Sequence, residues 1–265
     1  MFPEIIRVSF KSLFQYRWTF AVTIVTQPFV LLLNMALFTS IYAYNHTDMI
    51  KGYGYEQMVW YFLSFMIVNA FVWNATTIIM SNKILSGDLT ADLLLPVSVS
   101  KLELGGSIAS RIIAIIMDFI PTMIICSFIL FPSFITAASF ARFIVIVIPA
   151  FFLNYYWAFL LGLFAMVLKN NSFLYALNNL FAAFAGGAFI PLEFFPGWAN
   201  RVIALMPFKY VFYWPIQFFL NKAPADTWDA VPGILMIQIC WLSILVILCA
   251  LFWKILIRRY CAAGG

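Results

Sequence analysis

The chain has 265 residues, of which 65% are hydrophobic and only 9% are charged. This composition leaves too little polar surface to cover a soluble globule, so it predicts a protein embedded in lipid. The 15 Lys and Arg residues exceed the 10 Asp and Glu residues, but their distribution indicates membrane orientation, not binding to nucleic acid.

The N-terminal residues 1–17 predict a helix that lies on the membrane surface. At about 100° per residue, Glu4, Arg7, Lys11 and Gln15 share one narrow face, and apolar residues occupy the opposite face. The charges are spread through the segment and no small-residue cleavage site follows closely, so it is not a cleavable signal peptide. We expect an interfacial helix that stays on the protein.

Six apolar segments follow, and each is long enough for a span of about 20 residues. They cover residues 18–44, 58–80, 107–131, 143–168, 172–190 and 233–257. Pro28, Pro121 and Pro149 do not exclude these helices, because neighbouring spans can satisfy the freed backbone groups, but we expect kinks there. The fold class is therefore all-α integral membrane, with six transmembrane helices in a single domain over residues 1–265.

The basic residues indicate how the spans are oriented. If the N-terminus is cytoplasmic, ten basic residues lie inside and five outside. The inside set is Arg7, Lys11, Arg17, Lys83, Lys101, Arg111, Lys169, Lys254, Arg258 and Arg259, and the outside set is Lys51, Arg142, Arg201, Lys209 and Lys222. The positive-inside rule then places both termini in the cytoplasm, which agrees with an even number of spans. We expect a multi-pass protein of the plasma membrane.

Residues 81–106 form the longest predicted cytoplasmic connection. Ser86 or Asp88 can cap a short helix there, the leucines that follow supply an apolar side, and Pro96 ends it. The segment fits either a loop at the lipid interface or a docking element for a cytoplasmic partner, and its spacing leaves both open. The docking interpretation is based on four charged residues that a simple turn would not need: Asp88, Asp92, Lys101 and Glu103.

The segment GAFIPLEFFPGW stops the fifth span with Pro191 and Pro196, and residues 191–232 are too polar and proline-rich for a clean crossing. We expect two short helices that dip into the outer leaflet and return before the last span. Glu193 would lie at the rim, in reach of water or Arg201. An ordinary amphipathic outer loop is the alternative.

Few polar groups lie inside the spans. Asp118 is the sole acid well within one, at a cost of about 2.5–3.5 kcal/mol, and we favour a structural partner, with Arg111 as a candidate, over a transport proton. Asparagines in the spans fit interhelical hydrogen bonds. Mixed polar and aromatic residues also fit a path for an amphipathic solute: Phe65, Asn69, Trp73, Asn178, Phe181 and Phe184.

The sequence carries no recognisable catalytic machinery. Cys126, Cys240, Cys249 and Cys261 have no paired spacing, so they fit core residues and a terminal free thiol better than disulfides or a zinc site. His46 is the only histidine and stands in a polar loop. Without a nucleotide-binding glycine loop, a metal-ligand cluster or a Ser, His and Asp arrangement, we expect a non-enzymatic chain with no cofactor or metal of its own.

In their order along the chain, these features resemble the permease subunits of ABC exporters of the type-2 class. The resemblance covers nearly the whole chain and is strongest in ILSGDLTADLLLPVS, over residues 84–98, and in GGAFIPLEFFPGWANRVIALMPFKY, over residues 186–210. The first motif is especially similar to permeases that are often encoded as a pair beside one ATPase.

The resemblance implies a mechanism. A coupling helix would fit a groove in a cytoplasmic ATPase dimer, through Gly87, Asp88, Leu89, Asp92, Leu94 and Pro96. Pro191, Glu193 and Pro196 would belong to an outer re-entrant hairpin that caps the exit between two permeases, identical or sister. ATP and Mg²⁺ would be held by the partner ATPase, and membrane lipids would surround the spans. The alternative is an ATP-independent secondary transporter or lipid scramblase that uses Asp118 and the outer hairpin.

Overall fold

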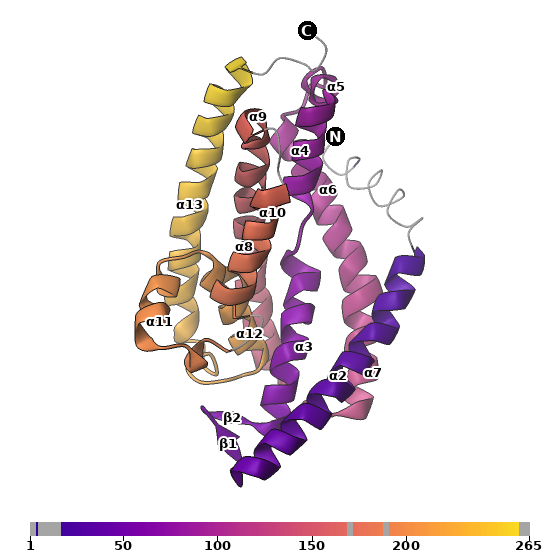
Figure 1. The fold of residues 1–265 in the computed structure, drawn as a ribbon, viewed down its shortest axis with the longest axis vertical. Helices are drawn as coiled ribbons and strands as arrows, with labels where there is room; N and C mark the ends of the chain where they lie inside the picture. Colours follow the sequence, from indigo (N-terminus) through magenta and orange to yellow (C-terminus); the bar gives the residue numbers. More distant parts are fainter. Residues whose placement is uncertain (1–3, 5–16, 169–171, 188–190, 260–265) are drawn as a thin grey trace.

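The computed structural model describes residue 4 and residues 17–168, 172–187 and 191–259 (Figure 1). These residues are mostly helical, apart from an antiparallel hairpin of strands β1 (Met49–Ile50) and β2 (Tyr53–Gly54). The interfacial helix predicted over residues 1–17 falls almost entirely outside the described residues. It therefore stays a prediction.

Four helical segments are long and apolar enough to cross a membrane on their own. They are α2 (Arg17–Asn45); α6 (Val99–Ala114), which continues through the π-helix η1 (Ile115–Phe119) into α7 (Ile120–Ile129); α8 (Ala137–Leu163) with α9 (Ala165–Leu168); and α13 (Ala230–Leu256). Helix α8 lies in the middle of the bundle and packs against α13 and α3 (Figure 1). The all-α membrane class is thus confirmed.

The second and fifth predicted spans differ from simple crossings. The second is a pair, α3 (Tyr55–Val72) and α4 (Thr76–Ser86), bent by 45° at residues 73–75. The fifth is α10 (Ser172–Ala185), whose 14 residues extend only about 21 Å, short of a hydrocarbon core about 30 Å thick. The described residues contain four candidate membrane spans, or up to six if each bent pair of helices forms one span.

The second bent pair lies in the predicted outer segment. The short 3₁₀-helix η2 (Leu192–Phe194) leads into α11 (Gly197–Ala204), which meets η3 (Lys209–Tyr213) and α12 (Trp214–Phe219) at 88°. A broken span and a re-entrant segment share this geometry. The sequence prediction of two short helices in this segment therefore agrees with the observed elements, while their position in the membrane stays a prediction.

Both π-helices are followed by a proline. The Ile120 N–H donates to the Ile115 carbonyl ahead of Pro121, and the Trp214 N–H donates to the Lys209 carbonyl ahead of Pro215. A proline lacks an N–H group and its ring clashes with the carbonyl four residues earlier, so a wider turn accommodates it. Helices α2 and α8, in contrast, continue unbroken through Pro28 and Pro149.

The two ends of the bundle carry different features. The short helix α5 (Leu89–Leu93) and the C-terminal end of α13 lie at one end, and the β1–β2 hairpin lies at the other (Figure 1). Of the three cysteines that the structure describes, Cys126 and Cys249 are buried, as predicted for core residues, whereas Cys240 is exposed on α13. Cys261 lies outside the described residues.

Candidate functional site

The bend between α3 and α4 is supported by side chains from other helices. The last carbonyls of a helix lack partners within it. Arg111 Nη1 donates to the carbonyls of Asn69 (3.0 Å) and Ala70 (3.2 Å), and Asn154 Nδ2 donates to the carbonyl of Val72 (2.7 Å). The Arg111 charge also lies where the helix dipole favours a cation. Helices α6 and α8 thereby fix the end of α3.

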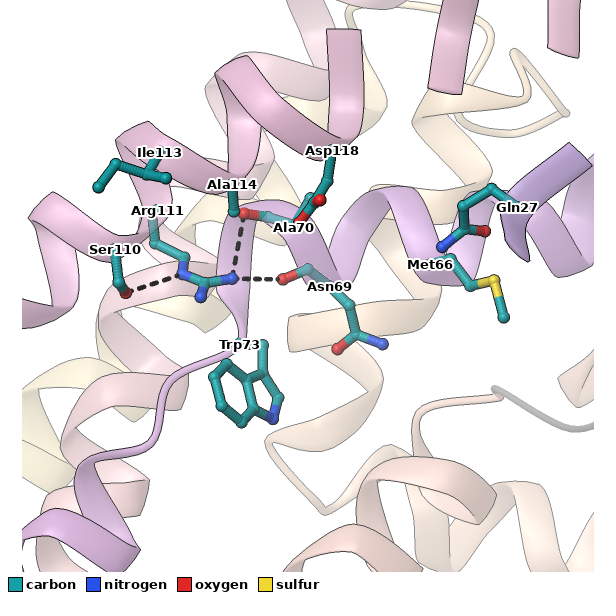
Figure 2. A pocket seen from close by; sticks show the side chains of 10 residues that line it. All are labelled: Gln27, Met66, Asn69, Ala70, Trp73, Ser110, Arg111, Ile113, Ala114 and Asp118. Atoms are coloured by element: carbon teal, nitrogen blue, oxygen red, sulfur yellow. Dashed lines mark hydrogen bonds between the residues drawn. The ribbon is translucent and has the colours of Figure 1, made fainter. Parts of the chain in front are cut away.

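A cavity of about 350 Å³ lies beside Arg111 (Figure 2). It is lined by Gln27 of α2, Asn69 of α3, Trp73 in the bend after α3, Arg111 of α6 and Asp118 of η1. The Arg111 guanidinium carbon lies 5.4 Å from the centroid of the Trp73 ring, within range of a cation–π contact. The cavity therefore combines an aromatic wall with a cation, an acid and two amides.

Asp118 and its candidate partner Arg111 line the same cavity and interact electrostatically, but none of the hydrogen bonds described joins them. The hydrogen bonds described for Arg111 go to backbone carbonyls and to Ser110, not to Asp118, although both charged residues line the same cavity. Asp118 Oδ1 and Gln27 Oε1 are buried without a hydrogen-bond partner among the described residues. Because buried acceptors are rarely left unpaired, this cavity suits an occupant that donates hydrogen bonds, water included.

The segment around α5 is tied to its neighbours by ion pairs. Gly87 ends α4 in the left-handed conformation (φ 87°) that favours glycine. Lys83 Nζ lies 2.8 Å from Asp92 Oδ2 and 2.6 Å from Glu103 Oε1, so it links α4, α5 and α6. Two of the four charged residues predicted to face a partner, Asp92 and Glu103, are therefore neutralised within the chain, while Asp88 accepts a hydrogen bond from Ser86.

The leucines of this segment point in two directions. Leu89 is fully buried, whereas Leu94 is 86% exposed and Leu93 and Leu95 are also exposed. We call Leu93, Leu94 and Leu95 the leucine tip. Pro96 follows them and is exposed as well. An apolar tip on a segment held by buried contacts offers a surface for another molecule.

Glu193 is the centre of a hydrogen-bonded cluster near the β hairpin. Pro191 precedes η2, which carries Glu193, and Pro196 precedes α11. Glu193 Oε1 accepts hydrogen bonds from the hydroxyls of Tyr53 (2.9 Å) and Tyr213 (2.8 Å) and lies 3.1 Å from Lys222 Nζ. The ionic partner is therefore Lys222 and not Arg201.

Two neighbours of Glu193 have altered acidity. Burial lowers the pKa of Lys222, and the negative charge of Glu193 opposes that shift. Burial, and next the charge of Glu193, raises the pKa of Tyr53, so its hydroxyl remains a hydrogen-bond donor. Lys222 Nζ also lies 3.1 Å from the centroid of the Tyr53 ring, and Gln217 Nε2 donates to the Tyr53 hydroxyl. The cluster thus joins η2, α12, the hairpin and the segment before α13.

A family model described as "ABC-2 family transporter protein" matches residues 30–264. The chain belongs to this family. No curated protein and no solved structure matches it significantly. The matched region includes the α5 segment, the Glu193 cluster and, apart from Gln27, the residues that line the cavity beside Arg111. The protein is therefore an ABC transporter permease with multiple membrane passes, and permeases of this family are generally non-catalytic components that typically work with an ATPase.

The predicted path residues of this ABC-2 permease do not form one site. Asn69 and Trp73 line the cavity. Phe65 packs instead on Phe212, with ring centroids 5.4 Å apart. On α10, the Asn178 Oδ1 accepts a hydrogen bond from Trp157 (2.8 Å), and Phe181 stacks on Phe208 at 5.8 Å. Phe184 is 48% exposed.

Two polar members of the cavity, Gln27 and Ser110, were not predicted from the sequence. Gln27 is a polar residue next to Pro28 in an otherwise apolar span, which is a usable signal. Ser110 precedes Arg111 and gives no signal of its own. The role of Arg111 as a cap for α3 depends on a bend that hydropathy alone does not reveal.

Proposed function

We propose that this ABC-2 permease is the membrane subunit of an ATP-driven exporter. It resides in the plasma membrane with both termini in the cytoplasm and forms the substrate path with a second permease, identical or sister. A cytoplasmic ATPase dimer, which holds ATP and Mg²⁺, drives it. The observation that carries this proposal is the exposed leucine tip on the α5 segment, because membership of the family calls for a surface that receives the ATPase.

The contacts of the α5 segment support a coupling role. Thr90 Oγ1 donates to the Gly87 carbonyl (2.7 Å), and Lys83 joins α5 to α4 and α6 through Asp92 and Glu103. A displacement of the leucine tip would therefore move two membrane helices together. ATP drives such a switch only through the different affinities of the two conformations for the nucleotide-bound ATPase.

The substrate path in this proposal runs between α3 and α10 of the paired permeases. It would be lined by Phe65 and Asn69 of α3, by Trp73 in the bend that follows, and by Asn178, Phe181 and Phe184 of α10. Within one chain these two elements are close, because the Tyr61 hydroxyl donates to the carbonyl of Gly187, just after α10 (2.7 Å). The segment with Pro191, Glu193 and Pro196 would close the outward end.

Replacing Leu94 with aspartate is expected to weaken association with the ATPase at least about tenfold, because it puts a charge into an apolar contact at a desolvated interface. The ATPase to test is one encoded beside this permease and containing the GxxxxGK[ST] motif. The two proteins are co-expressed, purified in detergent, and their dissociation constant is measured by titration.

Leu205→Asp is the matched control, because Leu205 is 76% exposed and lies at the end of α11. We expect it to leave the association unchanged. Gel filtration verifies that both variants are folded. Equal affinities for the wild type and Leu94→Asp would contradict the assignment of the leucine tip as the docking surface.

One observation favours the alternative of ATP-independent transport. Arg111 and Asp118 share a cavity within the spans, and Asp118 Oδ1 has no partner among the described residues. Such a group can serve a proton-coupled or scrambling cycle. Vesicles that contain this chain alone and no nucleotide separate the two functions: the exporter proposal expects no net transport and no lipid scrambling, whereas full activity there would establish the alternative.

A further inference from the structure

A second cavity, of about 580 Å³, opens where the linker from α5 to α6 meets α8 and α13. Ser98 and Lys101 lie at its polar side. Phe159 of α8 and Val246 and Trp253 of α13 contribute to its apolar walls. Its volume is in the range of sites for small ligands, and its lining combines one charged residue with mostly apolar surface.

Lys101 brings an uncompensated positive charge to this cavity. It is exposed, and it makes no salt bridge within the part of the chain that the structure describes. Lys83 differs, because two carboxylates of the same segment already hold it. Lys101 is therefore available to an anion that comes from outside the chain.

The cavity runs from the end of the bundle toward its apolar interior. Lys101 lies in the first turn of the span that begins at Val99, and α13 ends at Leu256. Trp253 and Val246 are separated along α13 by roughly 10 Å at 1.5 Å per residue. One leaflet of a hydrocarbon core is roughly 15 Å thick. The polar side therefore falls at the level of lipid headgroups and the apolar walls fall at the level of acyl chains.

We propose that this cavity binds an anionic phospholipid from the leaflet that surrounds the α5 end of the bundle. The phosphate group contacts Lys101 and the Ser98 hydroxyl, and an acyl chain lies along Phe159, Val246 and Trp253. A zwitterionic lipid offers the same acyl contact but no net charge, so Lys101 creates the preference. The site requires only that the protein reside in a membrane, and it does not depend on the exporter proposal.

Quenching of Trp253 by brominated lipids tests this site in the full chain. The protein is reconstituted in phosphatidylcholine vesicles with increasing phosphatidylglycerol, and only one of the two lipids carries brominated acyl chains. The fluorescence of Trp253 is obtained by subtracting the fluorescence of the same protein carrying Trp253→Phe from that of each protein. We expect the site to bind phosphatidylglycerol with an apparent affinity about fivefold higher than phosphatidylcholine, which is the gain expected from one lysine near an anionic lipid.

Lys101→Gln should abolish that preference. The matched control is Lys254→Gln, because Lys254 is exposed beside Trp253 but does not line the cavity, and it should keep the preference. Ala250→Phe fills the cavity and should reduce quenching by both lipids. The proposal is overturned by equal quenching by the two lipids in the wild type, by equal effects of the two lysine variants, or by unchanged quenching in Ala250→Phe. Gel filtration verifies that each variant is folded.

Discussion

Arg111→Met is expected to lower the free energy of unfolding by about 3 kcal/mol. The substitution removes the side chain that caps the Asn69 and Ala70 carbonyls at the end of α3. The Asn69 carbonyl keeps the Trp73 N–H as a donor, so the main loss falls on the Ala70 carbonyl, and a buried carbonyl left without its partner costs about 1–3 kcal/mol. The change also removes the cation nearest to Asp118 in the cavity. Chemical denaturation of the purified permease in detergent micelles measures the loss.

Two further variants separate capping from charge compensation. Asp118→Asn should cost less than about 1 kcal/mol, because Asp118 Oδ1 has no hydrogen bond among the described residues to lose. The double variant Arg111→Met, Asp118→Asn should remain nearly as unstable as Arg111→Met if capping dominates. Substantial rescue in the double variant would show instead that Arg111 acts by neutralising Asp118.

Glu193→Ala should have a comparable effect, also about 3 kcal/mol. One carboxylate oxygen accepts from Tyr53 and Tyr213 and pairs with Lys222, and hydrogen bonds to a charged group contribute about 1.5–3 kcal/mol each, without adding fully. Its loss leaves Lys222 half-buried without an acid. Denaturation measures the stability, and we also expect altered transport or stimulated ATP hydrolysis with assembly retained.

Two variants serve as controls for Glu193→Ala: one removes a hydrogen-bond donor of the cluster, and the other changes an acid whose hydrogen bond is exposed. Tyr213→Phe removes one donor and should cost about 1 kcal/mol. Glu56→Gln should change little, because Glu56 accepts an exposed hydrogen bond from Ser133. If Glu193→Ala were no more destabilising than Glu56→Gln, the cluster would not hold η2 in place, and Glu193 would be a rim residue as the sequence first suggested.

The sequence predicts those features that depend on local composition. Long apolar segments identified α2, the α6–α7 span, α8 and α13, because hydropathy over about 20 residues decides insertion. It did not predict the break at Trp73–Ala75, since that stretch looks apolar enough to continue a helix. The groups that stabilise the break, Arg111 and Asn154, come from α6 and α8 and meet α3 only in the folded chain.

The partners of the charged residues likewise depend on contacts that form only in the folded chain. The sequence placed Glu193 near the end of the fifth segment and gave Arg201 as its neighbour, because Arg201 is close along the chain. Lys222 and Tyr53 reach Glu193 only once the hairpin and the segment before α13 are folded together. Likewise, the leucines of α5 were recognised as apolar, but which of them are buried depends on how Lys83 ties the segment to α4 and α6.

The wide turn ahead of Pro121 has a mechanical consequence. A π-helix holds one residue more per turn than the helix on either side, and such an extra residue can move along a helix while the peptide hydrogen bonds exchange partners. Each one-residue step rotates the residue that it passes by about 100° about the helix axis, while the helix on either side keeps its orientation. Asp118 lies within this turn, so the third span contains a joint that can turn the acid at its middle toward different surroundings while the span ends stay in place.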